Sequence, residues 1–357
     1  MARTRFSNPS AELPLRDLPA SALRAVFREG YGRADLRADL MAGLVVGVVA
    51  LPLAMALAIA VGVPPQHGLY TAIVAGAVVA ALGGSRMQVS GPTAAFIAIL
   101  VPIQAQFGLS GLLVSGLLAG VILIAMGLFR LGKLIQFIPH PVTTGFTSGI
   151  AVVIATLQLK DFLGLRLASN PEHFFDRIAA FWAARGTFSP WELLVGVVTL
   201  ALLLGLPKVT KRVPAPIVAL PVAALFALAL SAFVPGLQLA TIATRFHYEV
   251  GGQLLPGIPQ LPPAPLWPWL ATVPGEPTLS LSWATLRALL PGAFAIAVLG
   301  AIESLLSAVI ADGVTRTQHD PDSELLALGV GNVVAPFFGG IAATGAIART
   351  ATNIRSG

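Results

Sequence analysis

The sequence predicts an all-α polytopic membrane protein, and two observations lead to this prediction. Of its 357 residues, 56% are hydrophobic and 11% are charged, and the mean hydropathy is +0.83. A soluble domain has about 25% charged residues, so too few charges are present here to cover a water-facing surface. Long stretches also lack charge altogether, such as Leu40 to Ser85, and a spanning helix needs about 20 apolar residues.

The charged residues that remain lie mainly in short connections between apolar stretches. The net charge is +6, but basic residues in such connections set membrane topology, so we expect no nucleic-acid partner. Residues 1–37 form an Arg-rich segment, and seven Arg precede Leu40. We therefore expect a cytoplasmic N-terminus and several passes through the plasma (inner) membrane. The absence of Cys excludes disulfides and thiolate chemistry.

Gly and Pro divide the apolar stretches into ten expected segments. These are 38–61, 68–84, 87–105, 109–129, 132–158, 191–210, 215–234, 284–311, 324–338 and one that begins near 345. The amphipathic stretch 159–189 and the Pro-rich stretch 235–283 are expected as external connections. Two GxxxG patterns, Gly43 with Gly47 and Gly116 with Gly120, predict close helix packing.

The third and tenth segments are expected to be broken helices. Pro92 has no N–H, so we expect a half-helix to begin there after a short extended stretch. Ser90-Gly91-Pro92 aligns with Thr344-Gly345-Ala346, and the tenth segment follows the third by seven, an odd number, which makes the repeat inverted. Two facing helix N-termini favour an anion, although each motif alone could be an ordinary kink. The candidate anion-binding residues are Gly91, Pro92, Thr93, Ala94, Gly345, Ala346, Ile347, Ala348 and Arg349.

Two ionisable residues fall inside the expected segments. Glu303 lies in the middle of the eighth segment, where a carboxylate usually faces a cavity, and Ser307 follows one turn later. We expect this pair to hold a coupling ion, H⁺ or Na⁺; the alternative is a protonated structural Glu. Arg349 would add positive potential near the anion, or would instead snorkel to the membrane surface.

Other functional motifs are missing from the sequence. The five His show no metal-ligand spacing, so we expect neither a metal nor a cofactor. The sequence also contains no G-x-S-x-G, H-E-x-x-H or P-loop motif, and we do not expect an enzyme.

Several of these residues resemble a known family. Pro65-Gln66-His67-Gly68-Leu69-Tyr70-Thr71-Ala72, continuing to Gly83-Gly84-Ser85-Arg86, resembles the signature of the SulP family of sulfate permease-like anion transporters. Asp39 to Ala60 is similar to the first helix of that family. Glu303 to Ser307 and Thr344 to Asn353 resemble the eighth and tenth helices.

The resemblance implies a seven-plus-seven inverted-repeat fold. Residues 38–130 would form core helices 1–4, residues 131–236 gate helices 5–7, residues 237–283 an external connection, and residues 284–357 core helices 8–10. The resemblance also implies a homodimer, helices 11–14 and a cytoplasmic STAS domain. Because the sequence stops at Gly357, we expect it to be part of a longer protein.

The resemblance further places the anion between the third and tenth half-helices, lined by the first and eighth helices. The lining from the first helix would include Leu53, Met55 and Leu57. The family often has Gln at Leu53, an aromatic residue at Leu57, a hydroxyl residue at Ala348 and Tyr at His67. The site is therefore expected to be less polar than usual, which leaves sulfate, bicarbonate and a C4-dicarboxylate such as fumarate open.

These features predict a secondary transporter of small oxyanions that works by proton- or sodium-coupled symport and alternating access. One alternative is an uncoupled anion exchanger or a channel-like anion path. A second is a proton-coupled nucleobase transporter, against which the signature near Tyr70 argues. A third, of another class, is a non-transporting membrane scaffold.

Overall fold

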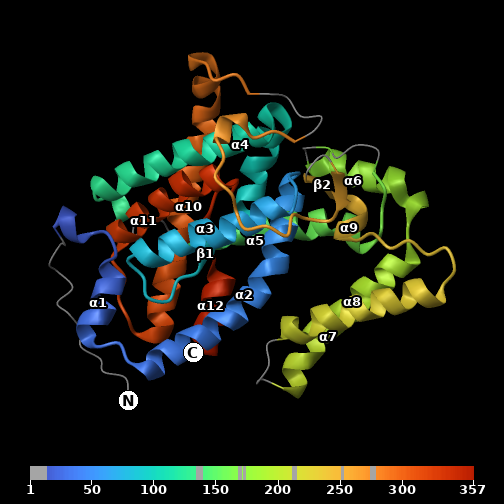
Figure 1. Cartoon of the computed structure of the whole chain (residues 1–357), viewed down its shortest axis with the longest axis horizontal. Coiled ribbons are helices and arrows are strands. Elements are labelled where there is room, and N and C mark those ends of the chain that lie inside the picture. The colour runs from blue at the N-terminus through green and yellow to red at the C-terminus, as the bar shows by residue number, and fades with distance from the viewer. Residues whose placement is uncertain are drawn as a thin grey trace. The chain divides into compact units, whose positions relative to one another are not determined.

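The computed structural model describes residues 14–133, 140–167, 171, 174–210, 215–250, 253–273 and 279–357. The chain divides into two compact units, and Figure 1 labels their helices and strands. The first unit comprises Met1–Val142 with Leu261–Gly357, and the second comprises Thr143–Gln260.

The first unit contains most of the helices. Its elements are α1 Ser21–Glu29, α2 Arg33–Val61, α3 Gln66–Leu82, β1 Ser90–Gly91, α4 Ile97–Leu128, α10 Trp283–Thr315, α11 Pro321–Val334, β4 Thr344–Gly345 and α12 Ile347–Ser356. Short 3₁₀ helices cover Leu15–Asp17, Ala94–Phe96, Pro268–Leu270 and Ala335–Phe338. These elements agree with the expected segments to within a few residues, except at the start of the third segment.

The expected boundary between the third and fourth segments is confirmed, because two helices meet there at a break within α4. Gly108 interrupts α4 with φ 65° and ψ −166°, a conformation that glycine adopts easily. The expected helix start at Pro92 is wrong, because Thr93 is still extended (φ −130°, ψ 155°) and the helical turns begin at Ala94. Within this longer extended stretch, the Pro92 carbonyl accepts a hydrogen bond from the Arg349 guanidinium at 2.6 Å.

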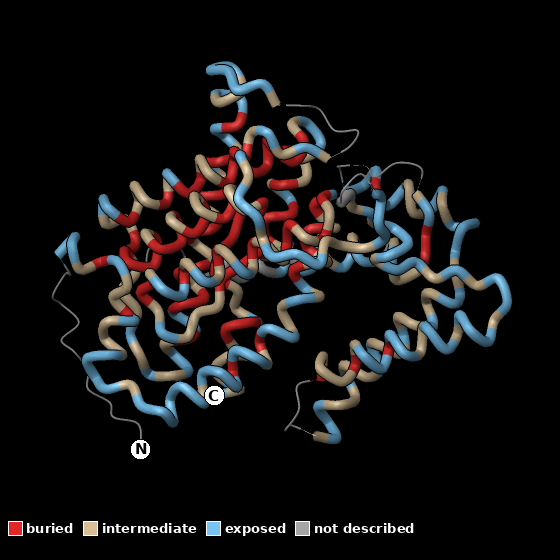
Figure 2. The backbone as a smooth tube through the Cα atoms, in the orientation of Figure 1, coloured by how far each residue is buried: buried red, intermediate tan, exposed pale blue. Residues whose placement is uncertain are grey.

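The core of the first unit lies where α4, α10 and α11 meet, and Figure 2 shows buried residues concentrated along these helices. Its fully buried side chains include Leu112, Leu123, Leu289, Ile296, Leu305 and Leu328. The close packing predicted at Gly120 is confirmed, since an added Cβ would lie 2.7 Å from the Gly329 carbonyl oxygen. At Gly43 and Gly47 the same prediction is wrong for the described residues, which place no atom within 4 Å of an added Cβ.

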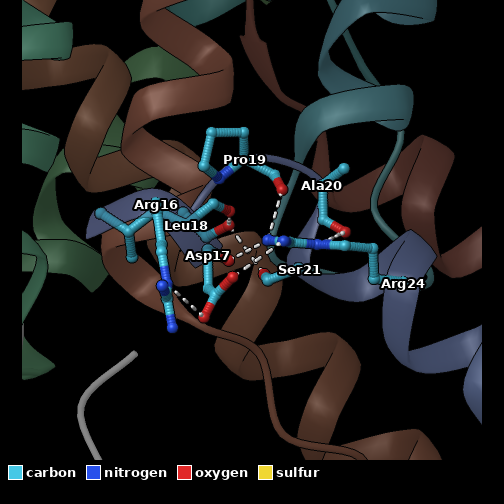
Figure 3. A network of polar contacts seen from close by, with 8 residues as sticks. Arg16, Asp17, Leu18, Pro19, Ala20, Ser21 and Arg24 are labelled. Atoms are coloured by element: carbon cyan, nitrogen blue, oxygen red, sulfur yellow. Dashed lines mark hydrogen bonds and ion pairs between the residues drawn. The ribbon is translucent and has the colours of Figure 1, made fainter. Parts of the chain in front are cut away.

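Residues 15–24 form a hydrogen-bonded turn that leads into α1. The Arg24 guanidinium donates to the Asp17 carboxylate at 3.2 Å and to the Pro19 carbonyl at 2.7 Å, which closes a tight turn (Figure 3). Leu18 within this turn is only 2% exposed, and Ala20 donates its N–H to the Leu82 carbonyl at 2.7 Å. The turn therefore docks at the end of α3.

The second unit is helical with one β-hairpin. Its helices are α5 His140–Phe162, which begins just before the unit boundary, α6 Phe174–Ala183, α7 Pro190–Val209, α8 Ala215–Phe233 and α9 Ile242–Arg245. Strands β2 His247–Val250 and β3 Gln253–Pro256 pair antiparallel, with His247 opposite Pro256. A 3₁₀ helix covers Ala184–Thr187. The stretches 159–189 and 235–283, both expected as plain external connections, thus contain regular structure: helix α6 lies in the first and the β-hairpin in the second.

Within the described residues, five helices are long and apolar enough to cross a membrane. They span Arg33–Val61, Ala94–Leu128, Pro190–Val209, Ala215–Phe233 and Trp283–Thr315. The shorter apolar helix Gln66–Leu82 adds to them. The prediction of a mostly helical membrane protein with several apolar spans is confirmed.

Candidate functional site

Two short strands bring the third and tenth segments together. β1 and β4 pair antiparallel, with Ser90 opposite Gly345 and Gly91 opposite Thr344. Ala346 extends the pairing by donating its N–H to the Val89 carbonyl at 3.0 Å. The two motifs that align in sequence are therefore bonded to each other in space.

Each strand leads into a helix start without a side-chain cap. The residues at the cap positions are Thr93 before the 3₁₀ turn at Ala94 and Ala346 before α12, and neither accepts a capping hydrogen bond. The first N–H groups of a helix have no partner within the helix and carry positive partial charge. Two such helix starts beside one strand pair can attract an anion.

Arg349 connects the two helix starts. It lies in the first turn of α12, is 2% exposed, and its Nη2 donates to the Pro92 carbonyl at 2.6 Å. Its Nε atom is buried and has no hydrogen-bond partner among the described residues. The guanidinium thus adds a fixed positive charge beside the extended stretch, with one donor unused.

Glu303 lies beside the same stretch. It is half-buried in α10 and accepts a hydrogen bond from the Thr93 hydroxyl at 2.9 Å. The Glu303 carboxylate and the Arg349 guanidinium also attract each other electrostatically. The structure therefore places Thr93, Glu303 and Arg349 in one cluster, in which the two ionisable groups have opposite charge.

Ser307 is one turn beyond Glu303 but has a different partner. Its hydroxyl, which is buried, donates to the Thr350 hydroxyl at 3.3 Å. Thr350 in turn accepts from the Val89 N–H at 3.1 Å. In the part of the chain that is described, no hydrogen bond joins Ser307 to Glu303, so the two residues expected to share an ion interact with different neighbours.

The other candidate residues differ in burial. Gly91, Pro92 and Gly345 are buried, Ala94, Ala346 and Ile347 are half-buried, and Ala348 is exposed. On α2, Leu57 is buried and Met55 is half-buried, whereas Leu53 is 40% exposed. The apolar side chains on α2 supply no hydrogen-bond donors, so charge and hydrogen bonding at this site come from the two helix starts and α10.

Sequence reasoning missed a second polar cluster near the strand pair. Gln88, Ser304 and Glu324 hydrogen-bond to one another, and Glu324 is 1% exposed. Glu324 follows Asp320 and Pro321, a pattern typical of a helix N-terminus with acidic residues in its first turn. A carboxylate in that position is ordinarily exposed, so the local pattern did not indicate a buried group.

Comparisons with known proteins agree with this architecture. Residues 36–357 match the Sulfate permease family. The chain is 43% identical over 296 residues to "Putative sulfate transporter YvdB" of Bacillus subtilis, covering 83% of this chain and 51% of that protein. It is 31% identical over 297 residues to "Bicarbonate transporter BicA" of Synechocystis, covering 81% of this chain and 48% of BicA. This chain therefore spans about half the length of these curated relatives.

Solved structures show the same fold. The transmembrane domain of a cyanobacterium bicarbonate transporter BicA superposes with a TM-score of 0.75 at 28% identity, covering 92% of this chain and 79% of that chain. This similarity includes the apolar spans, so the protein crosses the membrane several times. The profile match over residues 36–357 and the relative at 43% identity establish that the chain belongs to the sulfate permease (SulP) family.

Proposed function

We propose that this chain contributes the anion-binding part of a secondary active transporter for small oxyanions. The observation that carries the proposal is the convergence of two uncapped helix starts at the β1–β4 pair, with the buried Arg349 bonded to Pro92. Fixed backbone N–H groups and a guanidinium suit an oxyanion, because they offer several donors and positive charge without reorganisation. The anion would lie between Thr93 and Ile347, within reach of Arg349.

The names of the relatives narrow the substrates to test. Sulfate is named for YvdB and bicarbonate for BicA, and we propose that one of these, or a C4-dicarboxylate such as fumarate, is the substrate here. The apolar lining by Leu53, Met55 and Leu57 provides few donors for the four oxygens of sulfate. Bicarbonate, which is smaller and carries one negative charge, suits such a site better.

We propose that Glu303 couples transport to H⁺ or Na⁺, with Thr93 as its partner. A carboxylate within a membrane span is costly unless it takes up a cation or faces a polar cavity. Thr93 belongs to the extended stretch that leads into the first helix start, so a cation at Glu303 would act directly beside the anion. Alternating access would then move this core against the gate helices of the seven-plus-seven fold, in a homodimer.

Uptake into proteoliposomes tests the proposal. The purified protein would be supplied with radiolabelled sulfate, bicarbonate or fumarate, with and without an inward proton gradient and with Na⁺ replaced by K⁺. We expect one anion to accumulate in response to one gradient. Absence of uptake of all three anions by full-length protein shown to be folded would refute symport of these oxyanions and would favour exchange, another organic anion or a scaffold.

A matched pair of carboxylate variants tests the coupling. Glu303→Gln should abolish stimulation by the gradient, whereas Asp176→Asn, at an exposed position on α6, should leave it unchanged. If Glu303→Gln retains full gradient-driven uptake, Glu303 is not the coupling residue. If neither gradient stimulates uptake by the parent protein, uncoupled exchange is the better description.

A further inference from the structure

Glu324 is a buried carboxylate that the proposed transport cycle does not use. Its Oε2 accepts hydrogen bonds from the Gly84 N–H at 3.0 Å and the Ser85 N–H at 3.2 Å. Its Oε1 accepts from the Gln88 amide at 2.9 Å and the Ser304 hydroxyl at 3.3 Å. These donors come from α10 and from the segment before β1, so Glu324 of α11 ties three parts of the chain together. Loss of these bonds would leave buried groups unpaired, which is costly.

The Gln88 side chain carries this connection to the second helix start. Its Nε2 also donates to the Ser304 hydroxyl at 2.5 Å. A Cβ added to Gly345 would lie 2.2 Å from the same Nε2 atom, so the amide of Gln88 fills the space beside β4. The Gln88 side chain therefore hydrogen-bonds to Glu324 and packs closely against Gly345. The backbone of Gln88 lies two residues before β1, which begins at Ser90.

The beginning of α11 is fixed from the other side by the N-terminal turn of Figure 3. The Asp320 carboxylate caps the helix by accepting from the Ser323 N–H at 2.7 Å. Ser323 donates its hydroxyl to the Leu18 carbonyl and accepts from the Ser21 hydroxyl, the latter at 2.7 Å. Because α11 is held at its first turn, Glu324 is a fixed point against which the segment before β1 can be aligned.

We propose that Glu324 is a positioning residue that sets the register of β1 against β4 through Gln88, and thereby the anion affinity of the two helix starts. The inference rests on the proposed function, because it assigns Glu324 a role at the same anion site. Glu324 itself contacts neither helix start in the described structure; it acts through Gln88. A register set in this way keeps Ser90 opposite Gly345 and brings Pro92 within reach of Arg349.

A charge swap tests the proposal. Gln88→Glu places a second carboxylate against Glu324, so repulsion should displace the segment before β1. We expect the apparent KM for sulfate or bicarbonate uptake to rise about tenfold or more, as loss of a hydrogen bond to a charged group implies. The double variant Gln88→Glu, Glu324→Gln restores an amide–carboxylate pair with the partners exchanged, and should return the KM to within about threefold of the parent value.

The single variant Glu324→Gln, together with Gln88→Glu and the double variant, completes a double-mutant cycle. In Glu324→Gln, the Gln88 amide can rotate, because its Oε1 is buried and has no partner among the described residues, and can accept from the new amide. We therefore expect a smaller rise in KM than for Gln88→Glu. A merely structural role would lower the amount of folded protein and the thermal stability without changing KM, and that result would overturn the proposal.

A second readout does not depend on transport. Because the chain has no Cys, the pair Val89→Cys, Ala346→Cys reports directly on the strand pairing, in which these two residues occupy the next register position. Oxidation should form the disulfide readily in the parent background and in the double swap, and about tenfold more slowly with Gln88→Glu. Equal rates in all backgrounds would refute the role of Glu324 in register, even if the protein transported none of the tested anions.

Discussion

Gly345→Ala should weaken anion transport strongly, although it adds only one methyl group. The new Cβ would lie 2.2 Å from Gln88 Nε2 and 3.0 Å from Ser304 Cα, so backbone on one side and a bonded amide on the other confine it. To reach ordinary contact at 3.4 Å, the amide must retreat by roughly 1.2 Å. That movement breaks its 2.9 Å hydrogen bond to Glu324. A hydrogen bond to a charged group contributes about 1.5–3 kcal/mol, which corresponds to roughly a 10- to 150-fold change in an equilibrium constant.

The assay is uptake of radiolabelled anion by proteoliposomes over a range of anion concentrations. We expect Gly345→Ala to raise the apparent KM at least about tenfold, because the displaced Gln88 side chain shifts β1 relative to β4. Gly47→Ala is the matched control, since no described atom lies within 4 Å of its added Cβ, and its KM should not change. Equal KM values for Gly345→Ala and the parent protein would refute the reasoning.

Three further predictions concern other parts of the first unit. Arg349→Gln removes a buried positive charge and should raise the apparent KM of uptake by roughly 10- to 150-fold, whereas Arg349→Lys should recover part of the loss. Gly68→Ala places a Cβ 1.9 Å from the Ala54 carbonyl oxygen, so thermal unfolding in detergent should show a loss of about 1–3 kcal/mol. The hydrogen bond from Tyr31 to Asp39 raises the pKa of Tyr31 to about 12. Its stabilising effect should therefore be complete below pH 10 and be lost as the pH rises through 12, and ultraviolet titration of Tyr31→Phe and Asp39→Asn variants should identify this phenol.

The sequence predicted the broken segments because their signals are local. Gly91-Pro92 and Gly345 disfavour a continuous helix within apolar stretches, and such residues punctuate a chain wherever they occur. The alignment of the two motifs then indicated which segments to compare. The actual pairing of Ser90 with Gly345 goes beyond that alignment, since strand register depends on contacts between distant segments.

The features that sequence reasoning missed depend on such distant contacts. The helix starts at Ala94 instead of Pro92, and the Pro92 carbonyl is occupied by Arg349, which lies far along the chain. Glu324 has the local appearance of a residue in the first turn of a helix, and only the folded chain surrounds it with Gly84 and Gln88. A local pattern can predict where a helix begins, but not which buried groups will meet there.

The charges at the site give a physical reason to expect coupling. An anion at the two helix starts would be attracted by Arg349 and repelled by an ionised Glu303, which already attracts Arg349. A cation bound at Glu303 would remove that repulsion, so each ion would increase the affinity for the other by the same factor. We therefore expect the apparent affinity for the anion to increase with the concentration of the coupling cation, and the affinity for the cation to increase equally with the anion. Binding measured by calorimetry for both ions tests this reciprocity. In Glu303→Gln the anion affinity should become independent of the cation, and a persistent dependence would place the coupling site elsewhere.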